Sequence, residues 1–149
     1  MENHQISVES RPIDLILTSG IRLSGEMFLQ LHGLHGSGTQ RVGEVLNDEN
    51  NFLPVRTAEG LKLVNLDQIV AVSVAAETEF DSILALGEEH QVRVTTSVGE
   101  TLDTRIYVNL PIGRNRPKDF LDQKKRFLLF NVDEKVVYIA RRKIVFVED

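Results

Sequence analysis

The sequence predicts a mostly β protein in which one structural unit occurs twice, each time with a short helix. The first observation is a self-similarity: residues 41–72 align without a gap on residues 116–147, a shift of 75 positions. The 32 aligned positions hold eight identities, where average composition supplies roughly two. These identities are Arg41/Arg116, Leu46/Leu121, Phe52/Phe127, Leu53/Leu128, Glu59/Glu134, Ile69/Ile144, Val70/Val145 and Val72/Val147. A fixed-period similarity of this kind predicts two copies of one supersecondary unit.

The second observation is the alternation of apolar and polar residues, which indicates half-buried strands. In the segment IRLSGEMFLQLH, the apolar residues that share one face are Ile21, Leu23, Met27, Leu29 and Leu31. In the segment LDTRIYVNL, they are Leu102, Ile106, Val108 and Leu110. The dipeptides at 19–20 and 98–99 are predicted to be hairpin turns.

A short helix is expected inside each unit. The segments VGEVLND (42–48) and PKDFLDQ (117–123) are long enough for one to two helical turns. Pro117 suits a first helical position, and acidic residues stand early in both segments, as the helix dipole prefers. The helices should lay Val45 and Leu46, or Phe120 and Leu121, over one end of the strands that follow.

The strands after each helix are apolar on both faces, which predicts that the two units pack on each other. We expect one unit over 11–74, a connector over 75–90 with a helical turn after an Asp81 cap, and a second unit over 91–148. The core positions predicted to be buried are Phe52, Leu53, Ile69, Phe127, Leu128 and Ile144.

The segment LILTSGIRLSGEM (15–27) resembles the first sequence motif of Sm-like proteins, with Gly20 in the turn and Gly25 in the following strand. The segments VNLDQIVAV and YIARRKIVFV resemble the second Sm motif. The resemblance implies two tandem Sm-like or SH3-like small β-barrels, in which Gly25 lets a long strand bend. The Arg-Gly pair that reads RNA in Sm proteins is replaced here by Asn65-Leu66 and by Ala140-Arg141.

Composition limits the classes of function. The 149 residues carry a net charge of −5, with an acidic excess in 1–90 and a basic excess in 91–149. The absence of cysteine excludes disulfides, thiolate zinc sites and a cysteine nucleophile. No apolar run reaches the ~20 residues of a membrane helix, and the N-terminus lacks the pattern of a secretory signal. We therefore expect a cytoplasmic protein that does not associate with membranes.

The glycine-rich segment HGLHGSGTQR contains His32, His35 and Arg41. It offers two imidazoles without a third metal ligand nearby, so no metal site is predicted. It also lacks the Lys and the Ser/Thr of a phosphate-binding loop. A loop between a strand and a helix explains the segment best, although its extra length relative to the second unit makes it a candidate acquired feature.

Nine basic residues of the second unit form three loop clusters, which are the candidate sites for an anion or a partner. They are Arg114, Arg116 and Lys118; Lys124, Lys125 and Arg126; and Arg141, Arg142 and Lys143. A pI of about 5.4 argues against a dedicated nucleic-acid binder. Nucleic acid therefore stays possible as a partner but is not favoured over a solvated or intramolecular charged face.

No spacing typical of a catalytic site stands out, and no cofactor is predicted. The favoured function is a non-enzymatic module for protein interaction or self-association, with a protein partner or a homo-oligomer expected. The first alternative is binding of RNA or another polyanion through the basic loops of the second unit. The second alternative is small-ligand binding or catalysis at the cleft between the units.

Overall fold

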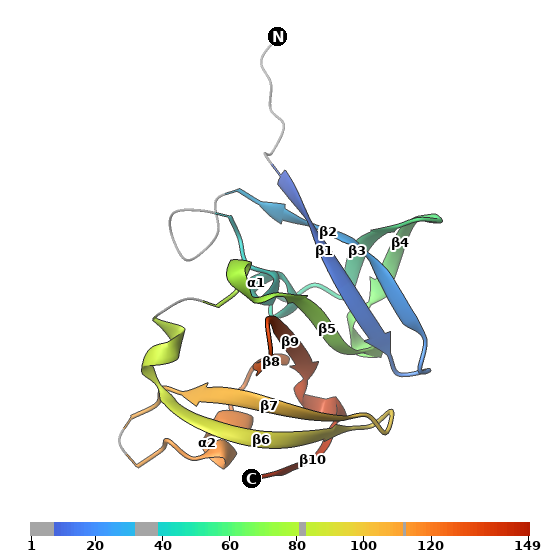
Figure 1. The fold of residues 1–149 in the computed structure, drawn as a ribbon. Coiled ribbons are helices and arrows are strands. Elements are labelled where there is room, and N and C mark those ends of the chain that lie inside the picture. The colour runs from blue at the N-terminus through green and yellow to red at the C-terminus, as the bar shows by residue number, and fades with distance from the viewer. Residues whose placement is uncertain (1–7, 32–38, 81–82, 112) are drawn as a thin grey trace.

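The protein is mostly β, and its strands join in one open antiparallel sheet (Figure 1). The computed structural model describes residues 8–31, 39–80, 83–111 and 113–149. Within these residues, ten strands and two short α-helices are found. The strands are β1 (Val8–Leu17), β2 (Arg22–Gln30), β3 (Phe52–Thr57), β4 (Gly60–Asn65), β5 (Ile69–Ala75), β6 (Glu88–Thr96), β7 (Thr101–Val108), β8 (Phe127–Val132), β9 (Lys135–Ala140) and β10 (Ile144–Glu148).

The predicted helices are present as α1 (Val42–Leu46) and α2 (Pro117–Leu121). Short 3₁₀ turns follow β4, β5 and β9, as η1 (Leu66–Gln68), η2 (Ala76–Thr78) and η4 (Arg141–Lys143). A further turn, η3 (Leu84–Leu86), lies before β6. In the described part of the chain, no helix has the length and apolar character needed to cross a bilayer. Asp81, the expected cap in the connector, lies outside the described residues.

The strand order is β10-β6-β7-β8-β9-β5-β1-β2-β3-β4. In residues 8–75, here called the first half, β1 to β4 pair in succession and β5 returns to pair with β1. In residues 88–148, the second half, β6 to β9 pair in the same succession and β10 returns to β6. Five elements of the first half (α1, β3, β4, η1 and β5) begin 75 residues before α2, β8, β9, η4 and β10.

The two halves are joined by β5 and β9, which pair in antiparallel register from Ala71↔Ile139 to Ala75↔Lys135. Figure 1 shows these two strands at the centre of the molecule, between the two halves. The core crosses this junction in both directions. Phe127, Val136 and Tyr138 of the second half belong to the hydrophobic cluster of the first half, and Val70 and Ala71 of the first half belong to that of the second. Consecutive residues of β5 and β9 are therefore buried, as expected for strands covered on both faces.

The same expectation is wrong for the strands at the ends of the sheet. Phe52 was expected in the core but is 54% exposed, and Ile144 is only half-buried. In β10, Val145 and Phe146 are 58% and 53% exposed. The reason is position in the sheet: β10 has a hydrogen-bonded neighbour on one side only, and Phe52, on β3, pairs with Asn65 of β4, the strand at the other end. The other predicted core residues, Leu53, Ile69, Phe127 and Leu128, are buried.

Gly25 lies where β2 comes closest to β3. A Cβ atom at this position would lie 2.5 Å from the backbone oxygen of Arg56 and 2.8 Å from Cγ1 of Val55. Any larger residue would push the two strands apart, since real Cβ atoms do not approach a backbone oxygen this closely. Glycine is therefore required here by the close approach of β3.

Candidate functional site

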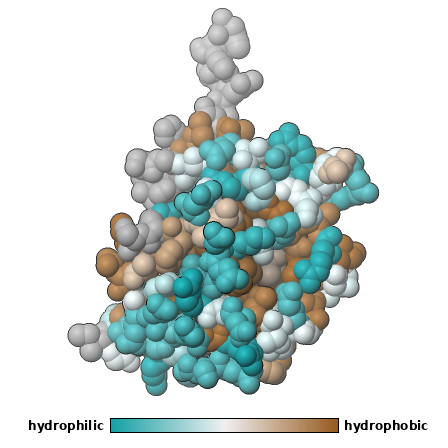
Figure 2. Space-filling model, in the orientation of Figure 1, coloured by the Kyte–Doolittle hydropathy of each residue, from teal (hydrophilic) through white to brown (hydrophobic). Residues whose placement is uncertain are grey.

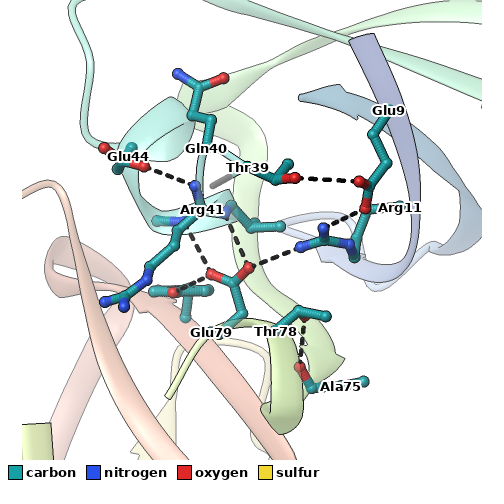
Figure 3. Close-up of polar contacts among 12 residues, drawn as sticks. Glu9, Arg11, Thr39, Gln40, Arg41, Glu44, Ala75, Thr78 and Glu79 are labelled. Atoms are coloured by element: carbon teal, nitrogen blue, oxygen red, sulfur yellow. Dashed lines mark hydrogen bonds and ion pairs between the residues drawn. The ribbon is translucent and has the colours of Figure 1, made fainter. Parts of the chain in front are cut away.

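A fully buried carboxylate stands beside the junction of the two halves. Glu79 follows η2, is 0% exposed, and accepts four hydrogen bonds (Figure 3). The donors are the Tyr138 hydroxyl at 2.5 Å, Nη1 of Arg11 at 3.2 Å, and the backbone N–H groups of Val42 and Gly43 at 3.1 and 3.4 Å. These donors come from β9, β1 and the first turn of α1, so one side chain of the connector ties both halves together.

The start of α1 lies directly against Tyr138. A Cβ atom built on Gly43 would come within 2.7 Å of Cε1 and 2.8 Å of the hydroxyl oxygen of Tyr138. Glycine at this position therefore lets α1 approach the ring and direct its first N–H groups at Glu79. Glu44 accepts the Arg41 N–H at 2.6 Å, which supports the same helix start.

The protonation of this cluster follows from its burial. Burial raises the pKa of Glu79 above its usual value, and the hydrogen bonds from Tyr138, Val42 and Gly43 offset part of this rise. Burial and the neighbouring carboxylate also raise the pKa of Tyr138. The phenol of Tyr138 therefore stays protonated at neutral pH and donates a hydrogen bond to Glu79.

A cavity of about 510 Å³ adjoins this cluster and is lined by residues of both halves. Its walls are largely apolar, with Phe80 and Tyr107 in ring contact at 5.1 Å between centroids and Phe120 and Phe127 nearby. Among the described residues, no Ser, Thr or His lines it, and the carboxylate of Glu79 is already engaged by four donors. Tyr138 and Glu79 form a hydroxyl–carboxylate pair in these walls, and this pair joins the two halves.

Two of the three predicted basic clusters come together in one groove. Lys124, Lys125 and Arg126, before β8, line it opposite η4, which contributes Arg141, Arg142 and Lys143. Two backbone contacts fix this arrangement: the Arg141 N–H donates to the oxygen of Arg126 at 2.9 Å, and its Nε donates to that of Lys125 at 3.3 Å. Sequence position did not reveal this proximity, because the two clusters are separated by β8 and β9.

The groove also contains an acidic residue of the first half. Arg126 donates to Oδ1 of Asp67 at 2.6 Å and to the backbone oxygen of Asn50 at 2.7 Å. The acidic loops of the first half and a basic loop of the second half therefore meet within one chain. Lys124, Lys125 and Arg142 are exposed and form no ion pair with an acidic side chain of the described residues.

The remaining candidates do not join this groove. Arg116 and Lys118 pair with acids of their own helical segment, Asp119 at 3.0 Å and Asp122 at 2.6 Å. Arg114 lies in the loop between β7 and α2. Arg41 precedes α1 and lines the cavity. His32 and His35 lie outside the described residues. In the rest of the chain, no group of three or more potential metal ligands is found.

The two ends of the sheet carry large apolar side chains at the surface. Around β4 these are Phe52, Leu61 and Leu63, and on β10 they are Val145 and Phe146, each more than half exposed. Figure 2 shows that hydrophilic residues cover most of the face drawn, with hydrophobic residues reaching the surface between them on the side where β1–β4 lie. We call these two regions the β4 edge and the β10 edge.

Comparisons with known proteins give the chain no relative from which a function could be transferred: no family model, no curated protein and no solved structure matches it.

Proposed function

We propose that this protein is a non-enzymatic self-association module, composed of two small Sm-like β-barrels related by an internal repeat, that assembles through the β4 and β10 edges. The observation that carries this proposal is the set of exposed apolar residues on both end strands of the sheet. The shared pairing order and the 75-residue displacement of the element boundaries support the repeat.

An unpaired strand presents a row of free N–H and C=O groups and is a template for pairing with another chain. Soluble proteins blunt such edges with charges, prolines or bulges. Here, Leu61 and Leu63 of β4 flank one lysine, Lys62, and β10 exposes two consecutive apolar residues, Val145 and Phe146. Exposed apolar residues with so few charges are typical of edge strands that another chain covers.

The enzymatic alternative has less support. The cavity at the junction is mostly apolar, and the one buried carboxylate beside it is held by Tyr138, Arg11 and the start of α1. These contacts explain the burial of Glu79 by a structural role, which is to hold the two halves against each other.

The proposal predicts that the purified chain forms oligomers whose size depends on concentration, as measured by size-exclusion chromatography with light scattering. Leu63→Asp and Phe146→Asp should each abolish this association, because both place a charge in the surface that becomes buried. Their melting temperatures at low concentration should match the parent's, since both side chains are exposed in the single chain. Leu86→Asp, at a residue 76% exposed in η3, is the matched control and should assemble like the parent. A parent that stays monomeric up to millimolar concentration would contradict the proposal.

Polyanion binding is a second candidate, favoured by the groove that unites the two basic clusters. It predicts that the parent binds heparin or short RNA with an affinity that falls steeply with salt. Lys124→Glu combined with Arg142→Glu should abolish this binding, whereas Leu63→Asp should leave it intact. Binding that is absent at low salt, or unchanged in the double variant, would rule out this candidate.

A further inference from the structure

We infer that the partner is a second copy of this chain and that the contact is head-to-tail: the β10 edge of one molecule pairs with the β4 edge of the next, in the geometry that β5 and β9 already have within the chain. This inference rests on the proposed function and specifies its contact.

The first support is a position-by-position correspondence in burial. Each of the five exposed apolar residues at the two edges lies 75 positions from a residue that the internal β5–β9 junction buries. Phe52 (54% exposed) corresponds to Phe127 (1%), Leu61 (62%) to Val136 (0%), Leu63 (65%) to Tyr138 (4%), Val145 (58%) to Val70 (0%), and Phe146 (53%) to Ala71 (2%). The exposed apolar residues of the two edges are thus at the positions that a β10–β4 junction between two molecules would bury.

The internal junction also indicates what would cover them. Phe127, Val136 and Tyr138 cross from the second half into the core of the first. By the same displacement, Phe52, Leu61 and Leu63 would pack in the hydrophobic cluster of the neighbour's second half. Val70 and Ala71 of the first half pack in the cluster of the second half, so Val145 and Phe146 would pack in the cluster of the neighbour's first half.

The second support is charge at the predicted register. Shifting the β5–β9 pairing by 75 residues on both strands places Phe146 opposite Val64, Val147 opposite Leu63, and Glu148 opposite Lys62. Opposite charges directly across from each other stabilise an antiparallel pair, whereas like charges destabilise it. The single lysine of β4 therefore meets an acidic residue of β10.

The third support comes from the loops beside the strands. Inside the chain, Asn47, Asn50 and Asp67 of the first half contact Arg126 and Phe127 of the second. The same displacement would bring Asp122, Lys125 and Arg142 of one molecule against Asn51 and Phe52 of its neighbour. Asn51 lies in the same loop as Asp48 and Glu49, so the two basic residues would lie beside an acidic loop.

A contact of either edge with itself lacks this complementarity. Strand β4 carries no acidic residue and β10 carries no basic one. Neither Lys62 nor Glu148 can therefore face an opposite charge when its strand pairs with its own copy, which disfavours both symmetric dimers. A head-to-tail contact can repeat, and it produces a ring or a filament according to whether the rotation closes.

The orientation can be tested by mixing two edge-blocked variants. Leu63→Asp retains the β10 edge and Phe146→Asp retains the β4 edge, so each alone should be monomeric and an equimolar mixture should form 1:1 dimers and nothing larger. If Phe146→Asp or Leu63→Asp dimerises by itself, the head-to-tail arrangement is wrong, although the protein still self-associates. A parent that never associates contradicts the proposed function itself, so the two failures are distinguishable.

The register can be tested by charge reversal. Lys62→Glu and Glu148→Lys should each weaken the association measured by analytical ultracentrifugation, on the order of fivefold, because like charges then face each other. The double variant restores an opposite pair and should return to within about twofold of the parent. Asp14→Lys, a charge reversal at an exposed residue of β1 inside the sheet, is the control and should behave like the parent. A double Lys62/Glu148 variant that is weaker than either single variant would overturn the register.

Discussion

Phe127→Ala is expected to lower the free energy of unfolding by about 3–5 kcal/mol, whereas Phe52→Ala, at the corresponding position of the first half, should lower it by less than about 1 kcal/mol. Phe127 is 1% exposed and packs in the core of the first half, so its truncation leaves a cavity where the halves meet. Phe52 is 54% exposed, and its truncation opens none.

The measurement is urea denaturation followed by circular dichroism. It should be made in the Leu63→Asp background, because association would otherwise add to the apparent stability of the parent. In the background able to assemble, Phe52→Ala should instead weaken the oligomer, since Phe52 would be covered there. Equal losses of stability for the two alanine variants in the monomeric background would contradict the difference in burial between Phe127 and Phe52.

Glu79→Ala is expected to cost about 3 kcal/mol of stability. The substitution leaves Arg11, which is only 7% exposed, without its buried partner, and it removes the acceptor from the Tyr138 hydroxyl and from two N–H groups of α1. The cost is set at the lower end of the range for buried ion pairs because Arg11 retains Glu9 at 2.5 Å. Thermal unfolding of the variant should show the loss in both halves together, since Glu79 contacts elements of each. A loss below about 1 kcal/mol would contradict this role.

The Glu79→Gln variant tests how the charge of this side chain affects stability, because glutamine has nearly the same shape without the charge. Burial raises the pKa of the Glu79 carboxyl above its usual 4.5. The folded protein therefore binds this proton more tightly than the unfolded chain. The stability that the protonated form contributes is present below pH 4.5 and is lost as the pH rises through the folded-state pKa. The glutamine variant should lack this decrease when unfolding is measured from pH 4.5 to neutral pH. An unchanged pH dependence would show that another group produces it.

Local sequence pattern was sufficient for several elements of this fold. Alternation predicted strands where β2 and β7 lie, and the short helices were predicted where α1 and α2 lie. These features depend on residues close in sequence, whose side chains must match the period of a strand or the start of a helix. The both-face apolar character of residues 69–74 also correctly predicted that β5 is covered on two sides.

The tertiary structure decided what identical residue types do in the two halves. Phe52 and Phe127 stand at matching positions and carry the same side chain, yet only Phe127 is buried, because only β9 pairs with β5. Glu79 was one acid among several in a connector, and its four donors come from residues far away in the chain. The basic groove likewise exists because η4 lies against the loop before β8. Sequence pattern determines which strands can form, whereas the burial of a side chain depends on which strand lies beside it, and that neighbour is selected by long-range pairing.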